Sequence, residues 1–272
     1  MTLRNELEPI NGSRRVSNLL NSGAGVKSGS SVQVARGVIA NLKKDFDLPA
    51  YNPPLKIMLL GDSITYGIVG TNDRESGGYR TELWNKCVAD GLKVEFVGSR
   101  CTGPDSLSNK YHEGHSGWTI RQIAASINEW LNTYQPDLIL LMIGTTDTKE
   151  SSLKLMLNEL NALIDQITSQ SPHAQLLIAS IPPIHPVARP AHRALRAIYF
   201  NAAIPSILKF KVAQGKKVDF VDMRSLTLAD LTSSQSPDLD NGLHPNAQGY
   251  RKIANFWYDA VLAYCRLPIT KL

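Results

Sequence analysis

Cysteine is scarce in this sequence, with only Cys87, Cys101 and Cys265 among 272 residues. Three scattered thiols exclude a disulfide framework, and they lack the paired spacing of a zinc site. No apolar run approaches the length of a membrane span, and residues 1–9 lack the apolar stretch of a secretory signal. We therefore expect reduced thiols and a cytoplasmic protein without a membrane partner, and export by another route stays open.

The body of the chain also lacks an excess of positive charge. The formal net charge is +5, and residues 1–52 carry seven Lys or Arg against four Asp or Glu, which leaves +2 for the remainder. A nucleic-acid binder would show a basic stripe with interleaved aromatic residues, and the body contains none. The sequence thus predicts no nucleic-acid partner.

Two regions differ in composition. Residues 1–52 begin with Gly/Ser/Asn-rich stretches that cannot bury enough apolar surface to fold, so a flexible tail is predicted there. Within it, apolar residues at helical spacing between Val34 and Phe46 indicate a short amphipathic helix. Residues 53–268 are predicted to form one domain, because 43 % apolar residues can supply a sizeable core.

Strand-like and helix-like segments alternate along this domain. Helical spacing separates the apolar segments, and a helix near residues 190–214 is expected to be interrupted at Pro205. Thr119 and Gln122 form a capping-box pattern at the start of another helix. Such alternation predicts a three-layer α/β/α sandwich with a five-stranded parallel sheet in flavodoxin-like order. The expected strands are residues 55–60, 93–98, 138–143, 176–181 and 218–223.

The first strand ends abruptly at Gly61-Asp62-Ser63. The glycine allows a sharp turn at the carboxyl end of a buried strand, where open α/β sheets hold their ligands. This pattern favours a displayed serine hydroxyl. On this stretch alone, an equally good interpretation is that Asp62 and Ser63 only cap the following helix.

The other strand ends supply complementary groups. Gly98 follows the second strand, Thr145-Thr146-Asp147 follow the third, and His244 follows the fifth after a loop. A serine hydroxyl needs a neighbouring imidazole to take its proton, and His244 alone among six histidines combines a rim loop with the start of a helix. A single His-Pro is by itself more typical of a loop histidine bonded to backbone. However, His244 follows Ser63 and the intervening strand-end residues in an order along the chain that favours the catalytic interpretation.

At these residues the sequence resembles the GDSL, or SGNH, hydrolases, and more narrowly the carbohydrate esterases of family three, which include acetylxylan esterases. The resemblance covers residues 55–266 and not the tail. Several blocks in register carry it, namely Gly61-Asp62-Ser63-Ile64-Thr65-Tyr66-Gly67, Gly77-Gly78-Tyr79-Arg80, Phe96-Val97-Gly98-Ser99, His112-Glu113-Gly114-His115-Ser116-Gly117-Trp118, the Gly144-x-x-Asp147 block and Gly242-Leu243-His244-Pro245-Asn246.

The resemblance implies ester hydrolysis through an acyl-serine, with no metal or cofactor. Ser63 would be the nucleophile and His244 the base and then the acid, while the backbone N–H groups of Ser63 and Gly98 would stabilise the oxyanion. The third oxyanion donor corresponds to position 146. Asp62 and Asp147 are expected to belong to the substrate cleft, and four further residues are expected to shape that cleft or brace its loops: Tyr79, Arg80, His115 and Trp118. His112, Glu113 and His115 lie in a glycine-broken loop with no further ligand at a recognisable metal-site spacing.

Two positions depart from the family pattern. The third block of the family reads Gly-x-Asn-Asp, whereas this chain has Thr146 in place of the Asn donor. The aspartate that orients the catalytic histidine is here Asn241, which cannot stabilise an imidazolium with a charge. We therefore expect impaired activity. Asp240 or Asp238 could replace the missing carboxylate, and deamidation of Asn241 before Gly242 could restore it.

Three functions follow in order of preference. The first is an esterase for small acyl groups, above all acetyl, on a carbohydrate or similar polar alcohol. The second is a catalytically silent protein that binds a sugar or acyl ligand in the same cleft. The third, a flavodoxin-like nucleotide or phosphate binder, lacks a glycine-rich cradle of the expected length. The oligomeric state cannot be predicted from these patterns.

Overall fold

The computed structural model describes residues 53–69, 76–228 and 242–266. These residues belong to one compact unit, Ala50–Leu272. The predicted tail and its amphipathic helix lie outside the described residues.

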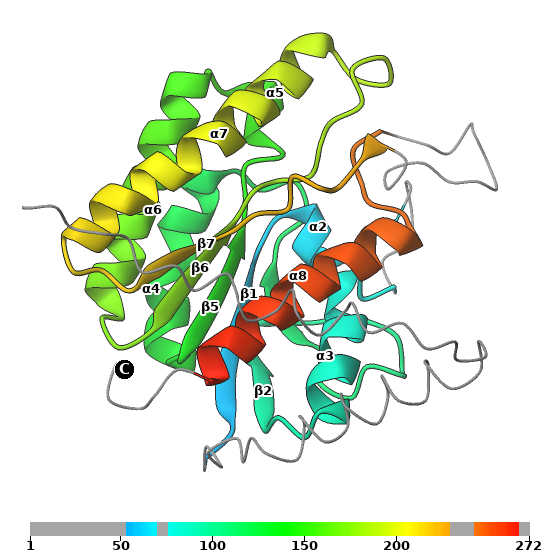
Figure 1. Ribbon diagram of the computed structural model, residues 1–272, viewed down its shortest axis with the longest axis vertical. Helices are drawn as coiled ribbons and strands as arrows, with labels where there is room; N and C mark the ends of the chain where they lie inside the picture. The colour runs from blue at the N-terminus through cyan, green and yellow to red at the C-terminus, as the bar shows by residue number, and fades with distance from the viewer. Residues whose placement is uncertain (1–52, 70–75, 229–241, 267–272) are drawn as a thin grey trace, which may run out of the picture. The chain divides into compact units, whose positions relative to one another are not determined.

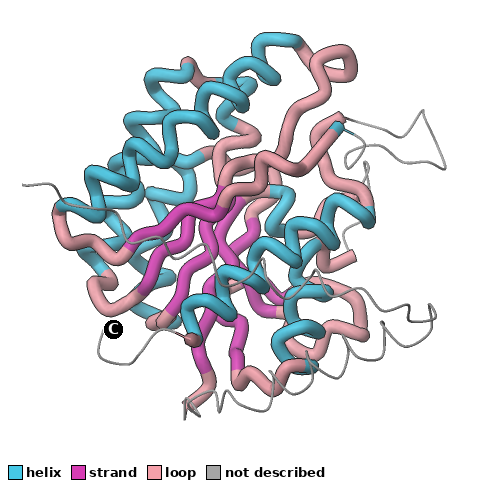
Figure 2. Tube along the Cα trace, viewed as in Figure 1, coloured by secondary structure: helices cyan, strands magenta, loops and turns pink. Residues whose placement is uncertain are grey.

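Five parallel strands form the centre of this unit. Figure 2 shows them side by side, and their order is β2-β1-β5-β6-β7. Their continuous apolar runs suit a sheet that is covered on both faces. The predicted five-stranded parallel sheet and its flavodoxin-like order are thus confirmed. The strands are β1 Leu55–Gly61, β2 Val94–Val97, β5 Leu138–Met142, β6 Gln175–Ala179 and β7 Val218–Val221.

Two further short strands were not predicted. β3 (Arg100–Cys101) and β4 (Tyr111–Gly114) form an antiparallel pair, and β4 also runs parallel to the end of β1, with Leu60 opposite Glu113. The sequence Tyr-His-Glu-Gly lacks an apolar run, so its pattern does not predict a strand. Together, β3 and β4 bring the sheet of the described residues to seven strands.

Helices cover both faces of the sheet, as right-handed crossovers require. Figure 1 shows α3 and α8 on one side and α4, α6 and α7 on the other. Two single-turn helices, α2 (Ser63–Tyr66) and α5 (Asp147–Glu150), begin near the carboxyl ends of β1 and β5. The long helices are α3 Tyr79–Ala89, α4 Ile120–Tyr134, α6 Leu153–Gln170, α7 Ala191–Ala213 and α8 Ala247–Cys265.

Two helix predictions have different outcomes. The capping box at the start of α4 is confirmed, because Thr119 and Gln122 bond reciprocally. The predicted interruption at Pro205 is wrong, since α7 continues through it. Pro205 lies on the exposed side, while Phe200, Ile204 and Leu208 are buried around it, and this packing holds the helix despite the missing N–H.

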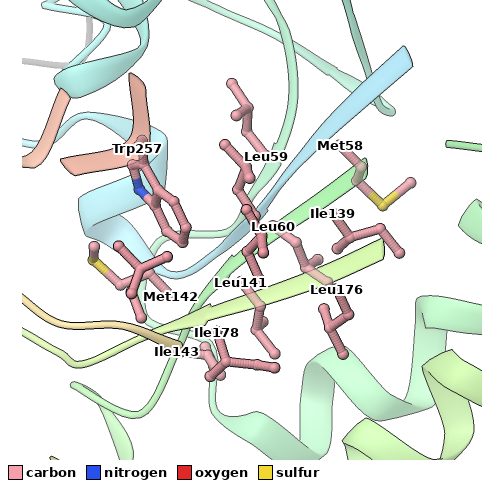
Figure 3. Packing of buried hydrophobic residues seen from close by; sticks show 14 of the residues in the cluster. Met58, Leu59, Leu60, Ile139, Leu141, Met142, Ile143, Leu176, Ile178 and Trp257 are labelled. Atoms are coloured by element: carbon pink, nitrogen blue, oxygen red, sulfur yellow. The ribbon is translucent and has the colours of Figure 1, made fainter. Parts of the chain in front are cut away.

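The core is one continuous apolar cluster on the strands and the inner helix faces. Figure 3 shows side chains of β1, β5 and β6 packed together, with Trp257 of α8 joining them. Burial of these side chains fixes the strand ends, and with them the loops that carry the polar residues.

Candidate active site

Ser63 stands at the sharp turn between β1 and α2. Asp62 caps the helix, because its Oδ1 accepts the N–H of Ile64 at 3.0 Å. Ser63 is 6 % exposed. Gly114 of β4 lies directly against α2, and a Cβ there would overlap the backbone of Thr65 and Tyr66. The close contact between β4 and the serine turn therefore requires glycine at this position.

His244 reaches Ser63 from the other end of the chain. The two residues are 181 positions apart, yet His244 Nε2 lies 2.9 Å from Ser63 Oγ. An N···O separation of this length allows the hydroxyl to donate to an unprotonated Nε2. The structure therefore brings together the two side chains that the resemblance assigned to nucleophile and base.

The segment that carries His244 is held from both sides. Asn246 caps α8, with its Oδ1 accepting the N–H groups of Gln248 and Gly249 at 2.9 Å. On the other side, the N–H of His185 donates to the carbonyl of Gly242 at 2.9 Å. These backbone contacts fix the position of the imidazole relative to Ser63. Asn241, and with it Asp238 and Asp240, lies outside the described residues, so its part in the site stays a prediction.

The two remaining oxyanion candidates follow neighbouring strands. Gly98 comes directly after β2 and has a φ of 153°, and a Cβ there would overlap the carbonyl of His112. Thr146 precedes α5, is half-buried, and its side chain does not cap that helix. Parallel strands point their carboxyl ends to one rim, so both residues belong to the rim that carries Ser63. Their role as donors stays a prediction.

Asp62 and Asp147 do not line a cleft, which corrects the expectation for these two residues. Both are fully buried. Burial raises the pKa of the Asp62 carboxyl to about 6 and that of Asp147 to about 7. Asp147 accepts the N–H of Ile120 at 3.1 Å, and so ties the turn after β5 to the start of α4.

Tyr79 and Arg80 are also fully buried, so they brace loops rather than contact a substrate. The Tyr79 hydroxyl donates to Thr65 Oγ1 at 3.1 Å. The Arg80 guanidinium donates to the carbonyls of Thr65, Tyr66 and Thr102 at 2.8–3.0 Å. Burial lowers the pKa of Arg80 to about 10. Its bonds fasten α2 to the segment that follows β3.

Of the six expected cleft residues, Trp118 keeps the most exposed surface, because it is half-buried. His115 is 8 % exposed, and its ring stacks on Trp118 at 4.2 Å and on Trp130 at 4.7 Å between centroids. The His115 N–H donates to the carbonyl of Gly61 at 2.9 Å. This bond places the aromatic cluster directly beside the serine turn.

Two buried charged residues at the rim were missed. Glu113 is fully buried in β4 and bonds to Ser99 and His115. Arg193 of α7 is 6 % exposed and donates to the carbonyl of Thr145 at 3.1 Å. A signal for the arginine existed, since position 193 lies four residues before Ala197 on the apolar stripe of α7.

His112 is a neutral structural side chain. Its Nδ1 accepts the N–H of Gly114 at 2.9 Å, so Nε2 carries the proton and donates to Thr102 Oγ1 at 2.8 Å. Burial lowers the pKa of His112 to about 2. Among residues 53–69, 76–228 and 242–266, no three His, Cys, Asp or Glu side chains gather as metal ligands. Within the same ranges, no helix has the length and apolarity needed to cross a bilayer.

A flavodoxin-like sheet with a serine–histidine contact at its carboxyl rim defines the class of α/β proteins with serine-hydrolase geometry. The model of the GDSL-like Lipase/Acylhydrolase family matches residues 59–252. The chain belongs to this family.

Three individual proteins are similar to this chain. A family 3 carbohydrate esterase from Clostridium thermocellum is 40 % identical, with a TM-score of 0.63 over 78 % of this chain and 98 % of that one. An acetyl esterase mutant solved with an acetate ion is 25 % identical, with a TM-score of 0.64 and the same coverage. A multidomain esterase of Ruminococcus flavefaciens is 27 % identical over 89 % of this chain. The chain spans only 33 % of the length of this last relative.

Proposed function

We propose that this protein is a serine esterase that removes small acyl groups, above all acetyl, from a carbohydrate or similar polar alcohol. The observation that carries the proposal is the 2.9 Å contact between His244 Nε2 and Ser63 Oγ. The similarity to a family 3 carbohydrate esterase and to an acetyl esterase with bound acetate supports the substrate class.

The reaction would run in two halves. The Ser63 hydroxyl attacks the ester carbonyl while His244 Nε2 takes its proton, and the resulting tetrahedral intermediate carries a negative oxygen. The backbone N–H groups of Ser63 and Gly98 would donate to that oxygen, with the Thr146 hydroxyl as a third donor. His244 then protonates the leaving alkoxide. Water, deprotonated by the same imidazole, then attacks the acyl carbon, and the imidazolium returns the proton to Ser63 Oγ as the bond to the acid breaks.

Two residues would make this esterase slow. An amide at Asn241 cannot stabilise the imidazolium with a charge, and the equivalent change in a serine protease costs about 10⁴-fold in kcat. Replacement of an oxyanion donor, as at Thr146, costs about 10² to 10³-fold. The two penalties do not multiply, because residues of one catalytic unit are not additive. We therefore expect weak but measurable turnover.

A serine-directed fluorophosphonate tests the proposal, with the labelled residue identified by peptide mass spectrometry. We expect labelling at Ser63, loss of labelling and of acetate release in His244→Ala, and no loss in the matched control His173→Ala. His173 is an exposed histidine in the turn before β6.

Absence of Ser63 labelling in the wild-type protein would contradict the esterase. The departures at Thr146 and Asn241 favour one alternative in that case, a silent protein that keeps the cleft. Sugar or acetate binding without labelling, measured by calorimetry, would support this alternative.

A further inference from the structure

The second strand of the sheet leaves β1 before it reaches the serine turn. β2 pairs with residues 55–58 of β1, whereas β4 pairs with its last two residues, Leu60 and Gly61. Beyond Val97 the chain therefore has no ladder bond to β1 within the described pairs. Arg100, the residue after Ser99, pairs with His112 of β4, so contacts with β4 set the position of the Gly98–Ser99 turn relative to Ser63.

Glu113 of β4 adds direct hydrogen bonds to the turn itself. Its Oε1 accepts the backbone N–H of Ser99, and its Oε2 accepts the Ser99 hydroxyl at 3.0 Å. The carboxyl group is fully buried although Ser99 itself is exposed. A buried carboxylate forms strong hydrogen bonds with N–H and O–H donors, because no water competes for its oxygen atoms.

The same carboxyl group is tied to the serine turn. His115 Nε2 donates to Glu113 Oε2 at 2.7 Å, and the backbone N–H of His115 donates to the carbonyl of Gly61 at 2.9 Å. A single chain of bonds thus runs from Ser99 through Glu113 and His115 to the residue two positions before Ser63. Gly98 and Gly114 allow this close approach, because a Cβ at either would overlap neighbouring backbone.

We infer that Glu113 is a positioning residue: it holds the Gly98–Ser99 turn against the serine turn, so that the Gly98 N–H can donate to the oxyanion. This inference rests on the proposed esterase function. It adds to that function a residue that never contacts the substrate. A misplacement of about 1 Å in such a donor can cost about 10²-fold in rate.

The central variant is Glu113→Gln, which keeps the side-chain size but can no longer accept from all three donors. We expect kcat for 4-nitrophenyl acetate to fall by roughly 10²-fold with KM unchanged, because an oxyanion donor acts in the transition state. The inhibition constant of methylboronic acid, which forms a tetrahedral adduct with the serine, should rise by the same factor as kcat/KM falls. Inhibition by acetate should not change.

Two further variants accompany it. Ser99→Ala removes only the hydroxyl bond at an exposed position and should fold normally, with a smaller fall in kcat in the same direction. Glu129→Gln makes the same chemical change on the exposed face of α4 and should leave kcat unchanged. Amide hydrogen exchange at Gly98 and Ser99 should accelerate in Glu113→Gln and stay at the wild-type rate in Glu129→Gln.

The outcomes separate the two proposals. A Glu113→Gln protein that melts earlier but keeps its kcat and its boronate affinity would overturn the positioning role and leave the esterase intact. If Glu113→Gln does not fold, an unchanged kcat in Ser99→Ala would overturn it instead. A wild-type protein without Ser63-dependent hydrolysis would overturn both.

Discussion

Replacement of the buried Asp147 by asparagine should remove a large part of the dependence of stability on pH. The carboxyl group of Asp147 is fully buried and accepts the N–H of Ile120 at 3.1 Å. An asparagine Oδ1 can accept the same hydrogen bond, so Asp147→Asn removes the titrating group and changes little else. Burial raises the pKa of Asp147 from 3.8 to about 7, and the nearby Asp62 adds to this rise.

The direction in which the free energy of unfolding changes with pH follows from the number of protons bound by the folded and unfolded chain. Between pH 3.8 and about 7 the folded protein keeps a proton on Asp147 that the unfolded chain has lost. Unfolding then releases a proton, so the free energy of unfolding falls as the pH rises through this range. Each pH unit of pKa difference corresponds to about 1.4 kcal/mol, and the difference from 3.8 to about 7 therefore gives about 4 kcal/mol as an upper value.

Urea unfolding at pH 4, 5, 6, 7 and 8 measures this difference directly. We expect the wild-type curve to fall across the range and the Asp147→Asn curve to be flatter by up to about 4 kcal/mol. Asp222→Asn is the matched control, because Arg224 lowers the pKa of the exposed Asp222 and its removal cannot flatten the curve between pH 4 and 8. Parallel curves for wild-type and Asp147→Asn would refute the reasoning.

Three further predictions concern the rim. Thr146→Asn and Asn241→Asp restore the family residues, so each should raise kcat for 4-nitrophenyl acetate, and an unchanged kcat in both would mean that these positions are wrongly assigned. Arg193→Ala frees the carbonyl of Thr145, so kcat should fall by about tenfold or more at similar KM, whereas the same change at exposed Arg121 should have no effect. Gly114→Ala forces a Cβ into the backbone of α2 and should lower the free energy of unfolding by about 1–3 kcal/mol in urea titrations, and equal midpoints would contradict this contact.

The sheet could be predicted from the sequence because its central strands are continuous apolar runs. Runs such as residues 55–60 and 138–143 can be satisfied only by burial on both faces, and their spacing leaves room for one helix between neighbours. β4 gives no such signal. Tyr111–Gly114 contains a histidine, a glutamate and a glycine, and it is a strand because it pairs with β3 and with the end of β1 that β2 leaves unpaired.

Some residues of the site could be predicted from the sequence and others could not. Ser63 and His244 were found because strand ends share a rim, and because a serine needs an imidazole. Asp62, Arg80 and Asp147 were assigned to the cleft from the family resemblance, and all three are fully buried. Their burial depends on bonds to loop backbone that no local pattern encodes, such as those from Arg80 to the carbonyls of Thr65 and Thr102.

These buried charges share one physical function. Loops at the end of a sheet leave backbone N–H and carbonyl groups without ladder partners, and each such group must find another partner when it is buried. Around Ser63 the partners are side chains: Asp147 accepts from Ile120, Glu113 from Ser99, and Arg193 donates to Thr145. Thr146, which differs from the family pattern, is not among these three side chains. A change at position 146 therefore alters a functional group within a turn that its neighbours on both sides already hold, which is why a single substitution there can be expected to change turnover without rebuilding the site.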